Sequence, residues 1–183
     1  MTYFVHQGLL RDAGYCASPN CDARPEGMSV DLLVIHCISL PPGQYGGNEI
    51  EAFFTNQLDI NTHAYFAEIC HLQVSSHVLI RRCGDVLQFV NFNDRAWHAG
   101  ESIFEGRPRC NDFSIGIELE GTDTTTFTEA QYHGLVEVTT AIQRAYPAIT
   151  DSRITGHAQI APGRKTDPGP GFDWKHYRTT LKQ

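Results

Sequence analysis

The sequence predicts a single α/β or α+β domain in which helices flank a central mixed β-sheet. A continuous apolar run at residues 31–39 and a second β-rich run at 113–119 are typical of buried strands, and residues 128–146 show helical spacing. Strands and helices that alternate in this way favour one sheet with helical cover. The length of 183 residues fits one domain over residues 1–183, with 1–30 as an irregular segment packed on it.

The N-terminal part leads into the first predicted strand. Turn-forming residues, among them Pro19, Pro25 and Gly27, predict irregular structure there. The run over residues 31–39 is rich in Val and Ile, and its continuous apolarity predicts cover on both faces of the strand. His36 lies near the carboxyl end of this strand.

The next elements are a loop, a helix and a hairpin. Pro and Gly pairs at residues 41–47 predict a loop, and apolar residues at helical spacing predict a short helix over 49–58. The β-rich runs at 74–81 and 86–90 predict a hairpin, because Gly84 gives the connection the backbone freedom of a tight turn.

The second buried strand is followed by a capped helix. The strand at residues 113–119 places Glu118 near its exit. Thr128 and Gln131 have the spacing of a capping box, and Pro147 ends the helix that they begin.

The last part of the chain is mostly irregular. Residues 161–172 contain three prolines and three glycines, too many for regular structure, and residues 173–181 predict a short terminal helix. The sequence contains no internal repeat and no linker long enough to separate two domains.

The charge balance argues against a nucleic-acid partner. The chain has 14 Lys and Arg against 21 Asp and Glu, a formal net charge of −7. Affinity for a phosphate backbone comes mainly from clustered Lys and Arg, so we expect no nucleic-acid binding.

Membrane and export signals are not evident in the sequence. The N-terminus lacks a basic region followed by an apolar stretch, and the most apolar run, residues 32–38, is far shorter than the roughly 20 residues of a membrane span. The six cysteines show no CxxC spacing, which favours reduced thiols in a cytoplasmic protein.

Two histidines and one aspartate are candidate metal ligands. His36 follows an apolar strand, and His157 precedes a loop that reaches Asp167. Two imidazoles and a carboxylate suit Zn²⁺ and leave a fourth position for water. The alternative is a packed core histidine and a turn-capping aspartate before Pro168, and the spacing alone favours it because no HExxH signature is present.

Two further charged groups are candidates for acid–base and electrostatic roles. Glu118 and Glu120 alternate with apolar residues, so both carboxylates share one face of their strand. A general base and a solvated face of an edge strand are equally compatible with this pattern. Lys165 stands two residues from Asp167, where it can neutralise an oxyanion or simply belong to a surface charge run.

Candidate substrate contacts are the least specific. Arg109 can hold a carboxylate bidentately, although most arginines are merely exposed. Trp97 and His98 can form a wall for an apolar or sugar face, and core packing explains Trp97 equally well. A nucleophilic pairing of Cys37 with His36 is weakened because strand neighbours point to opposite faces.

Four segments carry a resemblance to a known family. Residues 33–43, 95–100, 109–121 and 155–170 are similar to the zinc-dependent N-acetylmuramoyl-L-alanine amidases. The resemblance covers nearly the whole chain and is strongest to members that act on 1,6-anhydro-muropeptides in bacterial cell-wall recycling. It implies the fold shared by peptidoglycan recognition proteins and the phage T7-type lysozyme.

The resemblance also assigns roles to the candidate residues. It implies a zinc cofactor held by His36, His157 and Asp167, with Glu118 as the catalytic carboxylate and Lys165 as its cationic partner.

It further implies that Arg109 holds the stem peptide of the substrate. Cys37 departs from the pattern, since related members have Asn at this position, and this puts in doubt any substrate contact there.

The expected activity follows from these roles. The resemblance implies hydrolysis of the amide between anhydro-N-acetylmuramic acid and the L-alanine of the stem peptide, by a cytoplasmic enzyme whose partner is an anhydro-muropeptide. We separately expect a monomer. Loops 41–47 and 161–171 are expected to frame the cleft. The alternative is a non-catalytic module that binds peptidoglycan in the same cleft without cutting it.

Overall fold

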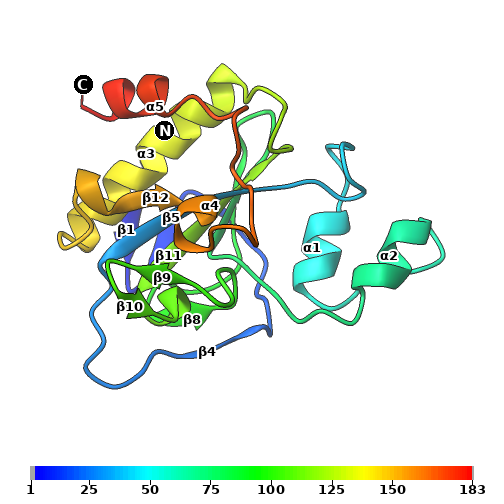
Figure 1. Cartoon of the computed structure of the whole chain (residues 1–183), viewed down its shortest axis with the longest axis horizontal. Coiled ribbons are helices and arrows are strands. Elements are labelled where there is room, and N and C mark those ends of the chain that lie inside the picture. The colour runs from blue at the N-terminus through cyan, green and yellow to red at the C-terminus, as the bar shows by residue number, and fades with distance from the viewer. Residues whose placement is uncertain (1–2, 183) are drawn as a thin grey trace.

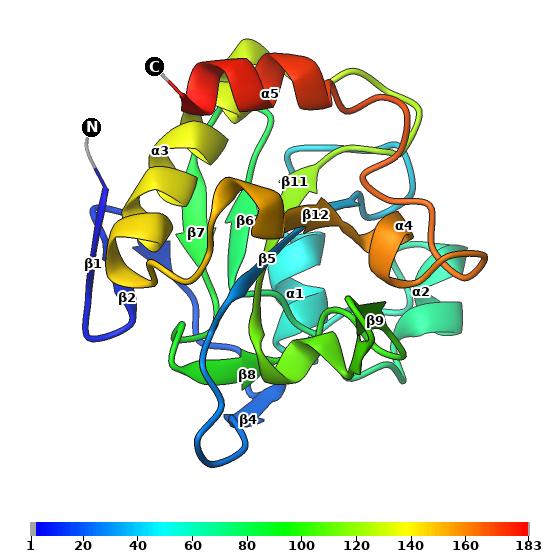
Figure 2. The same cartoon turned by 60° about the vertical axis from the view of Figure 1, so that its left-hand side comes forward.

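A computed structural model describes residues 3–182 and contains a six-stranded mixed β-sheet at its centre (Figures 1 and 2). In sheet order the strands are β12 (Ile154–Gly156), β5 (Leu32–Ile38), β11 (Ser114–Glu120), β6 (Val78–Ile80), β7 (Val86–Gln88) and β3 (Gly14–Tyr15). The first four run parallel to one another, whereas β7 is antiparallel to β6. The predicted mixed sheet flanked by helices is confirmed.

The two faces of the sheet bury different clusters. Helices α3 (Glu129–Ala145) and α5 (Trp174–Leu181) cover one face (Figure 2). Odd-numbered residues of β5 and β11 pack there with α3, in a cluster that includes Leu33, Ile35, Ile115, Ile117, Leu135 and Val138. Even-numbered residues of these two strands face the other way, where Leu32 and Val34 pack with Ile160 of α4 (His157–Ile160). Strand alternation therefore directs His36 and Glu118 away from α3.

A separate lobe beside the sheet consists of two short helices, α1 (Glu49–Phe54) and α2 (Ala64–Ile69) (Figure 1). The predicted helix over 49–58 is shorter than expected because Asn56 adopts a left-handed conformation (φ 60°), which ends a helix. The Asn20 side-chain amide donates to Phe54 O and to Asn56 Oδ1. Helix α2 was not predicted.

The N-terminal segment is not irregular, and this expectation needs correction. It forms β1 (Phe4–His6), β2 (Leu9–Arg11), β3 and β4 (Cys21–Ala23). The first two strands make a hairpin around Gln7 and Gly8, which both have positive φ, at 51° and 76°. Strand β4 pairs with β8 (Asp94–Ala96). The strands are too short to show period-two alternation, so their sequences gave no strand signal.

The remaining predicted elements are present. Strand β5, hairpin β6–β7, strand β11 and helix α5 confirm the expectations, and α3 begins with the predicted capping box, in which Thr128 Oγ1 accepts from Gln131 N at 3.1 Å. The edge-strand reading of Glu118 is wrong, because β11 is the third of six strands. Elements not predicted are β12, α4, β9 (Ile103–Phe104), β10 (Arg107–Pro108) and the 3₁₀ turns at Cys110–Asp112 and Asp151–Arg153.

Two loops that leave the sheet are packed on each other. Gly171 N donates to Asp123 O at 2.8 Å, and Gly169 has a φ of 74°. A side chain at Gly169 would collide with the Asp123 main chain, so this close approach requires glycine. The loop that contains Asp167 is thereby held against the loop that follows β11.

All six cysteines are free thiols, as the sequence predicts. Within residues 3–182, the structure contains no helix with the length and apolarity needed to cross a bilayer.

Candidate active site

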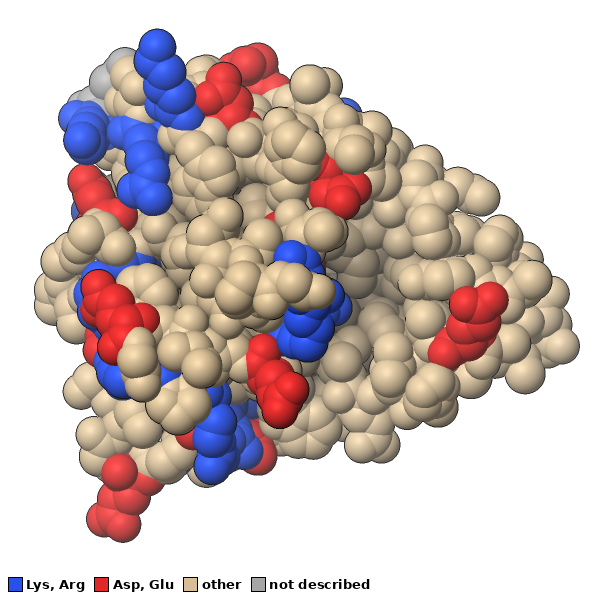
Figure 3. Space-filling model, viewed as in Figure 1, with Lys and Arg blue, Asp and Glu red and all other residues tan. Residues whose placement is uncertain are grey.

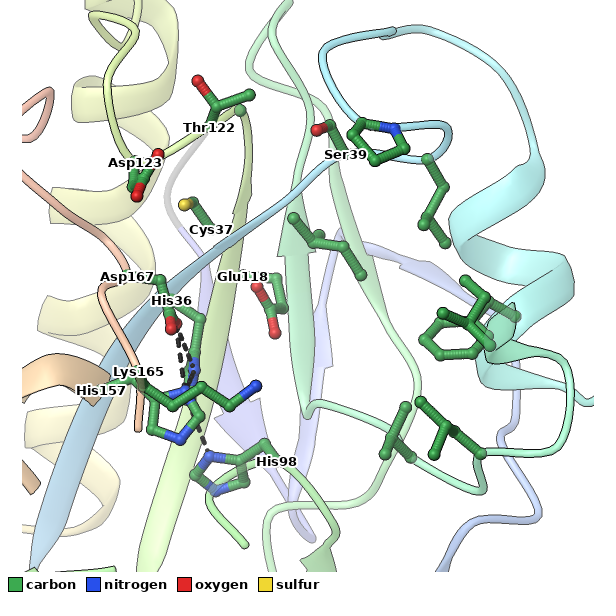
Figure 4. A pocket seen from close by; sticks show the side chains of 18 of the residues that line it. His36, Cys37, Ser39, His98, Glu118, Thr122, Asp123, His157, Lys165 and Asp167 are labelled. Atoms are coloured by element: carbon green, nitrogen blue, oxygen red, sulfur yellow. Dashed lines mark hydrogen bonds and ion pairs between the residues drawn. The ribbon is translucent and has the colours of Figure 1, made fainter. Parts of the chain in front are cut away.

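Three parallel strands bring the candidate catalytic residues to one edge of the sheet. His36 of β5 is paired in register with Glu118 of β11, and Gly156 of β12 is paired with Ile35. His157, the next residue after β12, therefore lies beside His36 (Figure 4). The carboxyl ends of parallel strands form a common edge where ligands bind.

His36, His157 and Asp167 converge on one point. The Nδ1 atoms of the two histidines lie 3.0 Å apart, and Asp167 Oδ2 lies 3.0 Å from His36 Nδ1 and 3.1 Å from His157 Nδ1. These donor atoms form a group that can hold a metal ion. The structure thus unites the three residues that sequence spacing alone assigned to a packed core and a turn.

Burial and hydrogen bonding set the charges of this triad. Burial lowers the pKa of His36 to about 4, although Asp167 opposes the change, so the imidazole is neutral at pH 7. Burial alone would raise the pKa of Asp167, but its contacts with His157 and His36 outweigh this and hold the pKa well below its usual value. A neutral imidazole and an ionised carboxylate are the protonation states that metal binding requires.

Glu118 is buried next to the triad without a full set of partners. Burial and, to a smaller extent, Asp167 raise the pKa of this carboxyl well above its usual value, while Lys165 opposes the rise. Its Oε2 atom accepts no hydrogen bond from the part of the chain that the structure describes. A buried oxygen left without a partner is costly unless a water or a ligand completes it.

Lys165 supplies a positive charge to the same space. It extends from the loop that also contains Asp167, and its ammonium group points into the cleft on the side of Glu118 (Figure 4). Its neighbour Arg164 instead donates to the main-chain oxygens of Ala99 and Glu101, at 2.6 Å and 2.5 Å. Of the two cations, Lys165 is the one directed at the site.

The triad opens into a cleft of about 520 Å³ between the sheet and the α1–α2 lobe, visible as a hollow in Figure 3. Both predicted loops contribute, since Pro42, Lys165 and Thr166 line it. Opposite the triad is an apolar wall formed by Phe53, Phe54, Tyr65, Ile69, Leu72 and Val74. This wall was not predictable from the sequence, because apolar residues at helical spacing resemble ordinary core positions.

Trp97 and His98 both line the cleft. Trp97 Nε1 donates to Asp22 Oδ1 at 3.2 Å, and this fixes the edge of the indole. The ring nitrogens of His98 lie 2.9 Å from His36 Nε2 and 3.1 Å from Ser114 Oγ. Both polar atoms of His98 therefore already have protein partners.

Arg109 is not among the residues that line the cleft. Its side chain is 70% exposed, and its Nε lies 3.3 Å from Asp112 Oδ2. The same aspartate pairs with Arg95 at 2.5 Å, so Arg109 belongs to a surface network of charges.

Cys37 lines the cleft beside the triad. Burial, followed by the charges of Glu118 and Asp167, raises the pKa of the Cys37 thiol. A protonated thiol is a poor nucleophile, which further weakens a pairing of Cys37 with His36.

The fold and the site define a class of peptide-amide hydrolases. The N-acetylmuramoyl-L-alanine amidase family matches residues 26–170, and the chain belongs to this family. It is an N-acetylmuramoyl-L-alanine amidase with the fold that the sequence resemblance implies.

Within this family, the chain is similar to proteins named AmpD in both sequence and structure. The chain is 57% identical to the 1,6-anhydro-N-acetylmuramyl-L-alanine amidase AmpD of Enterobacter cloacae, over 97% of this chain and 94% of the relative. A crystal structure of a selenomethionine AmpD derivative superposes with a TM-score of 0.94 at 56% identity and covers 96% of this chain and 98% of its own.

A more distant relative has been solved with a ligand. The amidase AmiD from Escherichia coli, in complex with the substrate anhydro-N-acetylmuramic acid-L-Ala-D-γ-Glu-L-Lys, superposes with a TM-score of 0.60 at 28% identity. This match covers 97% of the present chain and 65% of the relative.

Proposed function

We propose that this protein is a zinc-dependent amidase that cleaves the bond between 1,6-anhydro-N-acetylmuramic acid and the L-alanine of a stem peptide, in cytoplasmic recycling of the cell wall. The observation that supports this most directly is the triangle of His36, His157 and Asp167 donor atoms beside the unpartnered Glu118 oxygen. The matched relatives that are named for this substrate support the choice of the anhydro sugar.

The residues present fit zinc. Tetrahedral zinc with bonds of about 2.0–2.1 Å separates its protein ligands by about 3.3 Å, close to the spacing of the three donors here. Two neutral nitrogens and one carboxylate oxygen leave room for a further ligand, as in catalytic zinc sites. Zinc bound there would supply a Lewis acid that polarises the scissile carbonyl and makes water more acidic.

Glu118 is the proton carrier in this proposal. Because burial raises its pKa well above the usual value, the carboxylate can accept a proton from the attacking water and the acid can return that proton to the leaving amine. The burial of Glu118 on the central strand β11 fixes its position relative to the scissile bond. Proton transfer by such a group is typically worth about 10²–10⁴-fold in rate.

Lys165 contributes by charge. Its ammonium group points into the cleft, where it can offset the negative charge that develops on the carbonyl oxygen during attack. Because Lys165 and Asp167 lie on the same loop, which is packed against residues 123–125, the charge is held close to the triad.

Substrate recognition is assigned to the rest of the cleft. The apolar wall opposite the triad and the Trp97 indole offer surfaces for the sugar ring and its lactyl group. Arg109 is exposed, and we assign it to a carboxylate of the stem peptide. One chain supplies every catalytic group, so we propose a monomer, and the free cysteines fit a reducing cytoplasm.

The experiment is to incubate the purified protein with a defined anhydro-muropeptide and to follow the products by mass spectrometry. We expect separate anhydro-N-acetylmuramic acid and stem peptide, loss of turnover after chelation, and recovery when zinc is added back. Intact ligand that is bound but never cut would instead establish a peptidoglycan-binding module. Cleavage that is insensitive to chelation would refute the zinc assignment alone.

A further inference from the structure

The same dipeptide, His98–Ala99, contacts both histidines of the triad at Nε2, the ring nitrogen that points away from the donor triangle. His36 Nε2 lies 2.9 Å from His98 Nδ1, and His157 Nε2 lies 3.1 Å from Ala99 O. A carbonyl oxygen can only accept, so His157 Nε2 donates to Ala99 O. Arg164 Nη2 lies 3.5 Å from the same nitrogen, but it donates to Ala99 O at the much shorter distance of 2.6 Å. The Nδ1 atom of His157, which faces the triad, can therefore offer its lone pair to a metal ion.

The tautomer of His36 is determined by a longer chain of hydrogen bonds, which runs through Ser114 and His98. The Ser114 hydroxyl donates to Cys110 O at 2.6 Å, which uses its only proton. It must then accept from His98 Nε2, which lies 3.1 Å away. His98 Nδ1 is consequently an acceptor, and His36 Nε2 donates to it. The direction of this chain allows His36 Nδ1 to offer its lone pair to a metal ion as well.

One amide oxygen fixes the dipeptide. Asn111 Oδ1 accepts from both His98 N, at 3.1 Å, and Ala99 N, at 2.8 Å. Across the strand, Gly116 allows the His98 ring to lie against β11, since a Cβ atom there would come within 2.6 Å of the ring. By binding the two main-chain N–H groups of His98 and Ala99, Asn111 fixes the residues that contact both triad histidines.

We propose that Asn111 is a positioning residue that, through His98 and Ala99, sets the tautomer and orientation of both metal-binding histidines. The proposal rests on the metal site of the proposed function. It gives His98 a role toward His36 instead of a polar contact with substrate, because both of its ring nitrogens are used within the protein. Outer contacts of this kind orient metal ligands, and their loss typically weakens metal binding about 10–100-fold.

The first test is zinc affinity, measured by competition with a chromophoric chelator. We expect Asn111→Ala to bind zinc about 10–100-fold more weakly than the wild type. Asn111→Asp keeps an oxygen acceptor for the two N–H groups and should restore most of the affinity. The matched control is Asn91→Ala, which removes a loop amide oxygen that accepts from Asn93 N at 2.9 Å, away from the triad.

The outcomes separate the two proposals. Equal zinc affinity of Asn111→Ala and wild type would overturn the role of Asn111. A wild type that binds no zinc would instead refute the proposed function. Circular dichroism of the zinc-free variants identifies any that fail to fold.

The second test needs no variant. Imidazole ¹⁵N and ¹H shifts of the zinc-loaded wild type should show His36, His98 and His157 all in the Nε2–H tautomer. A Nδ1–H tautomer at His36 or His157 would overturn the inference even if every Asn111 variant failed to fold. In Ser114→Ala, the His98 signal should change while that of His157 stays the same, because only His98 donates to the hydroxyl.

Discussion

The two walls of the cleft are built in different ways. On the triad side, His36 and Glu118 lie on strands buried in the centre of the sheet, and hydrogen bonds orient their neighbours. On the opposite side, α1 and α2 have six residues each and present apolar side chains. On the triad side, hydrogen bonds fix the orientation of the polar side chains, whereas the apolar wall provides contact area without directional bonds.

The difference suggests a separation of tasks. Catalysis requires donor atoms and a proton carrier in defined positions, which central parallel strands provide. An apolar surface tolerates small changes in the position of its ligand, since its contribution scales roughly with buried area. Changes on the triad side should therefore act on turnover, and changes on the α1–α2 side should act on substrate binding.

The largest expected effect is loss of a triad donor. We expect His157→Ala to reduce hydrolysis of anhydro-muropeptide at least 10³-fold, because two remaining donors hold zinc poorly. Metal content by atomic emission, measured with the rate, checks the cause. Full zinc content and full turnover in this variant would contradict the catalytic role of the triad side of the cleft.

The next effect is on the proton carrier. Glu118→Gln keeps the size of the side chain but cannot accept a proton, so kcat should fall about 10²–10⁴-fold with zinc content unchanged. Pre-steady-state and steady-state rates at saturating substrate measure it. Full activity in this variant would remove Glu118 from the mechanism.

A third prediction concerns pH and the support behind the triad. His77 is fully buried beside Gly116 of β11, where its Nδ1 accepts from Gly116 N at 3.0 Å, and burial, then Arg24, lowers its pKa well below 6.5. The unfolded chain binds a proton below pH 6.5 that folded His77 does not. The free energy of unfolding should therefore decrease as pH falls from 6.5, by about 1.4 kcal/mol per pH unit for this group.

Urea unfolding of the zinc-free protein between pH 5 and pH 7 measures this slope. His77→Asn should have a shallower slope than the wild type, with the buried His36 and His98 contributing the remainder. Equal slopes in the two proteins would contradict the prediction.

The smallest effect is expected on the apolar wall. Leu72 is 41% exposed and lines the cleft, so Leu72→Ser should raise KM about 3–10-fold through lost apolar contact and leave kcat unchanged. Ile60→Ser is the matched control, since Ile60 is 50% exposed near the same lobe but does not line the cleft. A drop in kcat for Leu72→Ser would show that the two walls are not separate in function.

The elements with long, regular patterns were predictable from sequence. The apolar run that became β5 and the capped α3 are examples, because their patterns depend on local spacing. The short strands β1 and β12 are held by tertiary pairing, and their sequences carry no such signal.

The site was predictable only in part. Donor chemistry identified His36, His157 and Asp167 as candidates, but spacing alone did not favour them over structural roles, and the family resemblance made the assignment. The function of Asn111 was not visible, because its partners His98 and Ala99 are turned toward it by the fold.

The close packing of Gly169 and Gly171 on residues 123–125 limits how this enzyme can move. A movement of this loop that shifted Asp167 would also displace the residues that follow β11, the strand that contains Glu118. Entry of a bulky glycopeptide and release of its fragments must therefore be accommodated by the other side of the cleft, where no catalytic atom is disturbed.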